Sequence, residues 1–170
     1  MKTTGLFSML VLMVSFFSFT SASSQTAAKN KAACASFYEA FNHKDLTKIA
    51  TLVTDDFNDH ALPPDMAAQT GLSGKPLFLA ALKEYFNAFP DMQVRVIETV
   101  AEGNTVMVYL SMKGTHTGEF AGIPPTGKSI EISDVDIVKF DSNGKATDHW
   151  AVQDASLMMM QLGIAPMSKN

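Results

Sequence analysis

The chain has 170 residues, with 13 Lys and Arg, 17 Asp and Glu and one cysteine, so its formal net charge is −4. This length predicts one domain, and an apolar content of 46% is enough to fill its core. A single cysteine excludes an internal disulfide scaffold. The acidic balance and the lack of a Lys/Arg cluster indicate no nucleic-acid partner.

The N-terminus has the pattern of a secretory signal peptide. Lys2 precedes an uncharged apolar run of 14 residues, Leu6–Phe19, and small residues at 20–22 suit a cleavage site. The run is shorter than the roughly 20 residues that a transmembrane helix needs. We expect a signal peptide over 1–22, a flexible lead-in over 23–31, a domain over 32–164 and a tail over 165–170. The mature protein is then secreted or periplasmic.

The first part of the mature chain has helical spacing. We expect helices over 27–42, 46–52 and 76–89, with a turn and short extended piece at 55–60 and a glycine-rich loop at 69–75. Asp45 is placed to cap the second helix, and Pro90 marks the end of the third. Pro63 and Pro64 block regular structure between the second and third helices.

From Met92 the apolar period changes from 3.6 towards 2, which predicts strands. The first strand turns at 102–104, and the others are expected over 105–115, 129–140 and 146–153. Asn143-Gly144 is typical of a tight hairpin turn, and a closing helix over 154–162 has Gly163 as its stop. Helices followed by a strand meander predict an α+β fold, with helices packed on one face of a curved antiparallel sheet around a conical cavity.

One segment matches a phosphate-loop pattern without its physical requirements. Gly122–Ser129 fits G-x-x-x-x-G-K-[ST], but two prolines remove N–H donors, and the residues after Lys128 have a strand pattern. That loop needs a helix N-terminus behind it to hold phosphates. We therefore expect no nucleotide partner.

The histidines do not form a metal motif. His43, His60, His116 and His149 have no zinc-ligand spacing, so we expect no metal. His60 ends an acidic segment, after Asp59. This segment is either an exposed turn with capping aspartates, or it places Asp59 or His60 at the cavity mouth.

Two carboxylates lie on the third strand in an apolar context. Asp134 and Asp136 are two residues apart, so both point to the face that carries Ile132 and Val138. If this face lines the cavity, burial and the like charge raise the pKa of at least one carboxyl, which suits a general acid or base. The alternative is an exposed face, or an ion pair with Lys128 or Lys139.

The last strand ends in a second polar group, Asp148–Asp154. Alternation places His149, with Ala151 and Gln153, on one face and Trp150, with Asp148 and Asp154, on the other. His149 is either a base or a structural histidine. Asp154 either binds substrate or caps the closing helix, and Trp150 serves in recognition or packing.

Several stretches of the sequence resemble a known family. They are Gly114–Lys128 (GTHTGEFAGIPPTGK), Asp136–Lys145 (DIVKFDSNGK), the triplet at 148–150 and Gln161–Gly163. Together they resemble the SnoaL-like polyketide cyclase, or ester cyclase, family over roughly residues 32–164. The resemblance implies the nuclear transport factor 2-like cone, with a cavity between curved sheet and helices, and often a homodimer.

The resemblance also implies a chemistry. Cyclases of the family close a ring by intramolecular aldol condensation, without metal or organic cofactor: a carboxylate removes a proton next to a carbonyl, and the enolate attacks a second carbonyl. The family's principal acid/base aspartate falls at Ala151 in this sequence, a pocket histidine falls at Asp136, and a polar pocket residue falls near Asp59 and His60.

Three hypotheses follow. The first is an exported, cofactor-independent acid/base enzyme that acts on a small apolar carbonyl compound or ester, with Asp136 as base and His149 or His116 as its polar partner. The substrate-binding candidates of this hypothesis are His60, Asp59, Asp134, Trp150 and Asp154. The second is a non-catalytic module that binds a small apolar ligand in the same cone. A structural dimer that uses the sheet for assembly is the third reading.

Overall fold

The computed structural model describes the backbone of residues 7–164 and the side chains of residues 23–164. The elements in chain order are α1 (Phe7–Asn42), α2 (Leu46–Leu52), β1 (Val53–Asp59), α3 (Met66–Thr70), α4 (Gly74–Ala88), β2 (Gln93–Glu102), β3 (Thr105–Thr115), β4 (Ser129–Phe140), β5 (Ala146–Gln153) and α5 (Ala155–Leu162). The side chains of the predicted signal peptide and the predicted tail lie outside this range. No helix in the described part of the chain is both long and apolar enough to cross a membrane.

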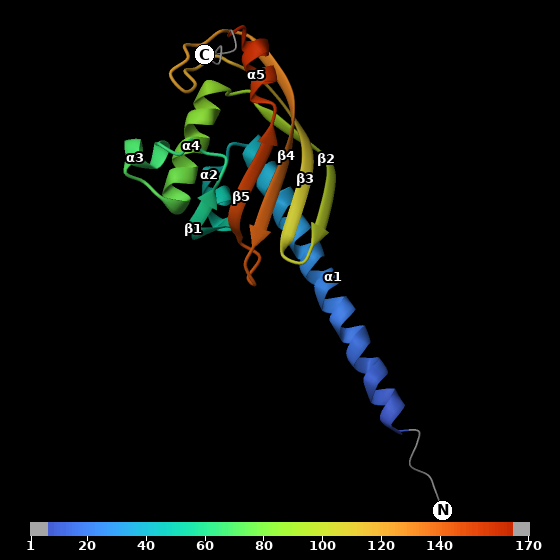
Figure 1. Cartoon of the computed structure of the whole chain (residues 1–170). Coiled ribbons are helices and arrows are strands. Elements are labelled where there is room, and N and C mark those ends of the chain that lie inside the picture. The colour runs from blue at the N-terminus through green and yellow to red at the C-terminus, as the bar shows by residue number, and fades with distance from the viewer. Residues whose placement is uncertain (1–6, 165–170) are drawn as a thin grey trace, which may run out of the picture.

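The five strands form one mixed sheet in the order β1-β5-β4-β3-β2. The four strands from β2 to β5 pair antiparallel, and β1 pairs parallel with β5 at one edge. Figure 1 shows α1 and α4 on the same side of this curved sheet, with the first part of α1 running away from it. The expected antiparallel sheet is thus present in these four strands, and the short extended piece expected at 55–60 joins it as the parallel edge strand β1.

Side chains alternate between the two faces of the sheet, as the period of two predicted. Val106, Val108 and Leu110 of β3 are buried beneath the helices, whereas Met107 and Tyr109 between them are exposed. The helices contribute mostly aromatic side chains to the same core, including Phe41 and Phe86, whose ring centroids are 4.9 Å apart. This inner face of the sheet and the helices above it enclose the site.

Local capping determines several helix ends. Asp45 accepts a hydrogen bond from the Lys48 backbone N–H at 2.8 Å and so begins α2. At the end of α1, the Asn42 side chain exchanges two hydrogen bonds with the Val94 backbone, at 2.7 and 2.9 Å. These two bonds tie the first helix to the start of β2.

The strand predictions agree with the structure, whereas one helix prediction and one loop prediction need correction. β3, β4 and β5 have the expected bounds. The helix expected over 27–42 is the second part of α1, whose backbone is helical from Phe7. The loop expected at 69–75 is shorter, because α3 extends to Thr70 and α4 already begins at Gly74.

Candidate functional site

A cavity of about 260 Å³ lies between the inner face of the sheet and the helices α1 and α4. Most of its wall is apolar and much of it is aromatic, with Phe37, Phe41, Phe57, Phe78, Leu82, Leu110, Met112 and Phe140. A cavity of this kind, with few polar groups, is typical of a small-molecule site. The predicted conical cavity is therefore present.

Four titratable groups from three strands line this cavity. Asp134 and Asp136 come from β4, His149 comes from β5, and Asp59 ends β1. The parallel pairing of β1 with β5 sets Asp59 beside His149 in the ladder. The inward direction of Asp134 and Asp136 confirms that this face of β4 lines the cavity.

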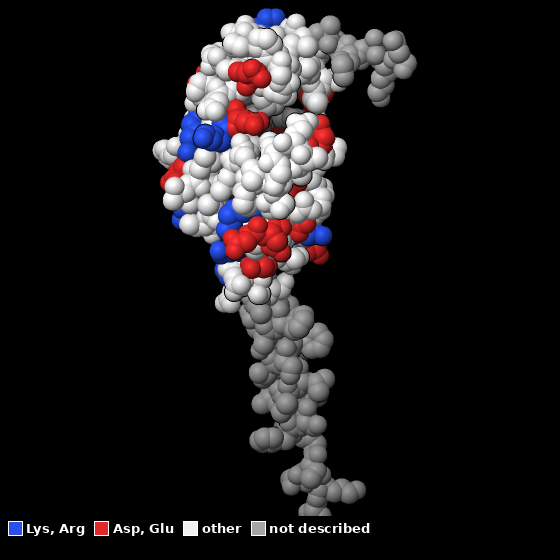
Figure 2. All heavy atoms as spheres, turned by 90° about the vertical axis from the view of Figure 1, so that its left-hand side faces the viewer, with Lys and Arg blue, Asp and Glu red and all other residues white. Residues whose placement is uncertain are grey.

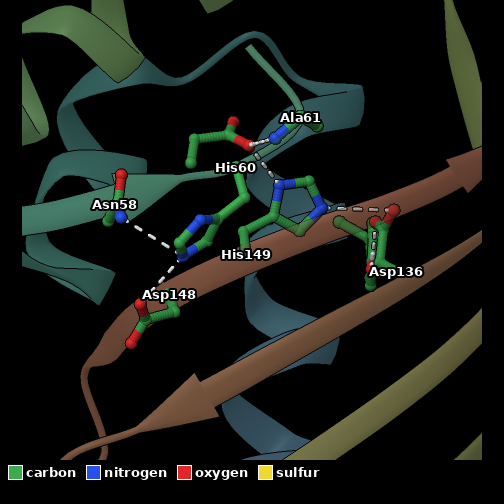
Figure 3. Close-up of polar contacts among 8 residues, drawn as sticks. Asn58, His60, Ala61, Asp136, Asp148 and His149 are labelled. Carbon is green, nitrogen blue, oxygen red and sulfur yellow. Dashed lines mark hydrogen bonds and ion pairs between the residues drawn. The ribbon is translucent and has the colours of Figure 1, made fainter. Parts of the chain in front are cut away.

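His149 lies between two carboxylates. Its Nδ1 is 2.8 Å from Asp59 Oδ1, and its Nε2 is 3.3 Å from Asp136 Oδ1. The Tyr38 hydroxyl of α1 donates to Asp136 Oδ2 at 2.7 Å, and the Ala61 backbone N–H donates to Asp59 Oδ1 at 3.0 Å. Figure 3 shows His149 at the centre of this network, with Asp136 on one side of the ring.

The network determines the charge of His149. Burial lowers the pKa of the imidazole, but the hydrogen bonds to Asp136 and Asp59, with the charges of both carboxylates, outweigh burial and raise the pKa to about 10. At neutral pH the ring is therefore an imidazolium that donates to a carboxylate from each nitrogen. This geometry suits His149 as the polar partner of Asp136 and disfavours the alternative of a base.

Asp134 has a different environment from Asp136. The residue is 5% exposed, and its Oδ1 has no hydrogen-bond partner among the described residues. Burial, and then the charge of Asp136, raises the pKa of the Asp134 carboxyl to about 6. The expectation that one carboxyl of the pair is desolvated with a raised pKa is confirmed.

His116 does not line the cavity, which corrects its expected role in the site. Its ring is buried against Phe89, with the centroids 5.1 Å apart. Its Nδ1 accepts from the Thr126 backbone N–H at 3.3 Å. The histidine fastens the loop between β3 and β4 to the end of α4, so its role is structural.

His60 and Trp150 lie on the other side of the sheet, which corrects their place among the substrate-binding candidates. Their rings stack with centroids 4.2 Å apart, and His60 Nε2 is 3.1 Å from Asp148 Oδ1. In Figure 3 His60 points towards Asn58 and Asp148, away from His149. Consecutive strand residues point to opposite faces, so His60 and Trp150 face outwards while their neighbours Asp59 and His149 face inwards.

Asp154 is also corrected, because it caps a helix. Its carboxylate accepts from the Leu157 backbone N–H at 3.0 Å and begins α5. Asp154 is not among the residues that line the cavity. The sequence is compatible with both roles of Asp154, and the structure shows the helix cap.

Three polar lining residues were not identified from the sequence: Tyr38, Tyr85 and Gln153. Tyr85 lies on α4 in an apolar helical stripe with Leu82 and Phe86. A hydroxyl inside such a stripe was the available indication, since a buried tyrosine O–H usually requires a polar partner. Ala151 also lines the cavity, directly across the ladder from Asp136.

The part of the chain that the structure describes also bears on the metal and phosphate-loop patterns of the sequence. Figure 2 shows acidic side chains gathered in one cluster on the surface. Within the described residues, however, no three His, Cys, Asp or Glu side chains are arranged to hold a metal ion. The chain continues from Lys128 directly into β4, as the sequence pattern predicted. The loop that resembles a phosphate loop therefore has no helix N-terminus behind it.

Comparison with known proteins places these features in a family. A sequence model described as SnoaL-like polyketide cyclase matches residues 32–162. No curated protein matches the chain. Among solved structures, AclR from Streptomyces galilaeus, assigned provisionally as a hydroxylase, is 26% identical with a TM-score of 0.68 and covers 82% of this chain and 88% of its own.

Two further solved structures are similar. IdmH from Streptomyces antibioticus, assigned provisionally as a polyketide cyclase, is 29% identical with a TM-score of 0.66, over 79% of this chain and 99% of its own. A protein from Jannaschia sp. CCS1, assigned provisionally as a SnoaL-like polyketide cyclase, has a TM-score of 0.70 at 20% identity, over 82% and 95% of the two chains. The α+β cone that the sequence predicted is thus the fold of these proteins.

Proposed function

We propose that this chain, which belongs to the SnoaL-like polyketide cyclase family, binds a small apolar carbonyl compound or ester in its cavity and moves a proton with Asp136 as base. One observation supports this proposal above all. The Asp136 carboxylate faces an apolar cavity, and each of its two oxygens accepts from one donor, the Tyr38 hydroxyl or the His149 imidazolium. A carboxylate oriented in this way can reach a bound carbon acid.

The proposed step is a proton transfer from carbon. Each carboxylate oxygen keeps a lone pair after accepting one hydrogen bond, so Asp136 can still take a proton. The proton leaves the carbon next to the carbonyl, and the electron pair of the C–H bond moves towards the carbonyl oxygen to form an enolate. The enolate then attacks a second carbonyl and closes a ring, and the alkoxide that forms takes the proton back from Asp136. Where the carbonyl is conjugated with a C=C bond, the dienolate can instead recover this proton from Asp136 at another carbon. This step requires no cofactor.

His149 and Asp59 support the base in this proposal. Asp59 holds Nδ1 of the imidazolium, which directs Nε2 to Asp136. The imidazolium pairs with the Asp136 carboxylate in an apolar wall, where an unpaired carboxylate is unfavourable. Asp59 is therefore a positioning residue, and Asp136 is the group that touches substrate.

The test is hydrogen–deuterium exchange at carbon. The probe is 4-hydroxyacetophenone in D₂O at neutral pH, and ¹H NMR follows the loss of its methyl signal. We expect exchange above the buffer rate, lowered at least about 100-fold by Asp136→Asn, as for the loss of a general base. Asp148→Asn is the matched control, because it removes a carboxylate from the outer face of β5. Exchange that survives Asp136→Asn would contradict the proposal.

The second candidate is a non-catalytic binding module. Ala151 favours it, because a methyl group stands where the resemblance places the principal acid/base aspartate. The similar proteins AclR and IdmH carry different provisional assignments, hydroxylase and cyclase, so the fold does not select one reaction. Native mass spectrometry of the purified protein separates the candidates. A bound molecule that stays chemically unchanged through repeated incubation supports the binding module.

We also propose a homodimer through the outer face of the sheet. Val100, Met107, Tyr109 and Val152 are exposed there on three strands, with Val152 64% and Val100 58% exposed. An apolar face of this extent is typical of an interaction surface. Met107→Asp should then convert a dimer to a monomer in sedimentation velocity. A wild-type protein that sediments as a monomer at micromolar concentration would contradict this.

Export is the third part of the proposal. It depends on the apolar run and the small residues that follow it, up to Ala22. N-terminal sequencing of protein recovered outside the cytoplasm should begin near Ser23. A sequence that begins at Met1 would contradict export by cleavage.

A further inference from the structure

Two buried polar atoms in the cavity wall have no hydrogen-bond partner in the described part of the chain: Asp134 Oδ1 and the Tyr85 hydroxyl. Buried polar groups in native proteins are almost always paired, because an unpaired one loses its hydration without compensation. Asp136 on the same strand contrasts with them, since Tyr38 and His149 occupy both of its oxygens. The unpaired atoms therefore call for a partner that is not part of the protein.

Both atoms belong to side chains that line the same cavity. Burial, and then the charge of Asp134, raises the pKa of Tyr85, which agrees with a carboxyl near the hydroxyl although no hydrogen bond joins them. Gln153 also lines the cavity and lies directly across the ladder from Asp134. We call Asp134, Tyr85 and Gln153 the hydroxyl corner. It combines a carboxylate acceptor, an O–H donor and an amide that can act as either.

We infer that the hydroxyl corner binds a hydroxyl group of the substrate, which donates to Asp134 Oδ1 and accepts from the Tyr85 O–H. The inference deepens the proposed function and rests on it, since it assumes that the cavity is the ligand site. One hydroxyl satisfies both unpaired atoms, whereas a carbonyl could pair only with Tyr85 and would face the carboxylate. The corner thus selects hydroxylated ligands.

The strand spacing gives the distance between the two functional groups of the substrate. Asp134 and Asp136 are two residues apart on β4, which corresponds to about 6.6 Å along a strand. The hydroxyl should therefore lie about 6–7 Å from the carbon that loses its proton to Asp136, a spacing derived from the same strand rise. A para-hydroxylated aryl ketone has approximately this separation. We therefore assign the substrate to hydroxylated aryl, or similarly rigid, carbonyl compounds.

The test compares 4-hydroxyacetophenone with 4-methylacetophenone, which has nearly the same shape without the hydroxyl. Isothermal titration calorimetry at pH 7 measures both dissociation constants. We expect the wild-type protein to bind the hydroxyl compound about tenfold more tightly, as for hydrogen bonds in a buried site. Tyr85→Phe should reduce this preference to about threefold or less, because one of the two hydrogen bonds is lost. Tyr109→Phe, which removes a hydroxyl from the outer face of β3, should keep it.

The outcomes separate this inference from the proposed function. Equal binding of the two compounds by the wild-type protein overturns the inference, whether or not the variants fold, and so does an undiminished preference in folded Tyr85→Phe. Deuterium exchange measured in the same wild-type samples tests Asp136. A binding preference for the hydroxyl compound without deuterium exchange supports the hydroxyl corner and contradicts the proposed catalysis. Deuterium exchange without a binding preference supports the proposed catalysis and contradicts the hydroxyl corner. Binding of neither compound overturns both.

Discussion

Asp134 and Asp136 form a matched pair for mutation. They lie two residues apart on the same face of β4, and both line the cavity. The Asp136 carboxylate accepts from two donors, whereas Asp134 Oδ1 is buried and has no hydrogen-bond partner in the described residues. Replacing each with Asn should therefore change the free energy of unfolding in opposite directions at pH 7.

Asp136→Asn should destabilise the protein. Asn keeps one oxygen, which can accept from Tyr38 or from His149 but leaves the other donor facing an NH₂ group. An unpaired buried donor costs about 1–3 kcal/mol. The loss of repulsion between Asp136 and Asp134 offsets part of this. We expect a net loss of about 1–2 kcal/mol, or roughly 2–8 °C in melting temperature for a domain of this size.

Asp134→Asn should stabilise the protein at neutral pH. Burial and the charge of Asp136 raise the pKa of the Asp134 carboxyl from 3.8 to about 6. Ionisation therefore opposes folding: the effect is absent below pH 3.8, grows as pH rises towards 6 and is complete above it. The shift corresponds to about 3 kcal/mol at most. Asp134→Asn removes this destabilisation at pH 7, and it has no such effect near pH 3.5, where the Asp134 carboxyl is protonated in both the folded and the unfolded state.

Urea unfolding, followed by the fluorescence of Trp150, the only tryptophan, measures both effects. Wild type, Asp134→Asn and Asp136→Asn are compared at pH 7, and the first two also near pH 3.5. Asp148→Asn is the control for removal of an acidic charge. An Asp136→Asn protein at least as stable as wild type at pH 7, or a clearly less stable Asp134→Asn protein, would refute the assignment of partnered and unpartnered carboxylates.

Three further results are expected. In an NMR titration the His149 ring should stay protonated through pH 8, and a midpoint near 6.5 would contradict the two-carboxylate geometry. Its contribution to stability is complete below pH 6.5 and should be lost as pH rises towards its pKa of about 10. Burial, with the charge of Asp136, raises the pKa of Cys34 to about 12, so a disulfide reagent at pH 8 should label the native thiol at least about 100-fold more slowly than the urea-unfolded one. Gly118→Ala should lower the stability by about 1–3 kcal/mol in thermal melts, because an added Cβ would overlap the Asn87 backbone carbonyl; an unchanged melting temperature would contradict that close approach.

The local elements follow from the sequence alone. The apolar period of two predicted β3, β4 and β5 with their bounds, because alternation along a half-buried strand is a local property. The caps at Asp45 and Asp154 could be proposed from the sequence because capping is also local: the carboxylate accepts from a backbone N–H three residues away. The spacing of Asp134 and Asp136 also predicted that they share one face of β4, but it left open whether this face lines the cavity.

Which polar groups meet depends on how the strands and helices pack together. Asp59 and His149 are 90 residues apart in the chain, and they are neighbours because β1 adds to the sheet parallel to β5. Tyr38 reaches Asp136 from a helix 98 residues away. Such contacts depend on the order and register of strands and on helix packing, which a local period does not encode. The histidines were indistinguishable by composition, and the fold directs His149 into the cavity, His60 to the outer face and His116 into a separate part of the core.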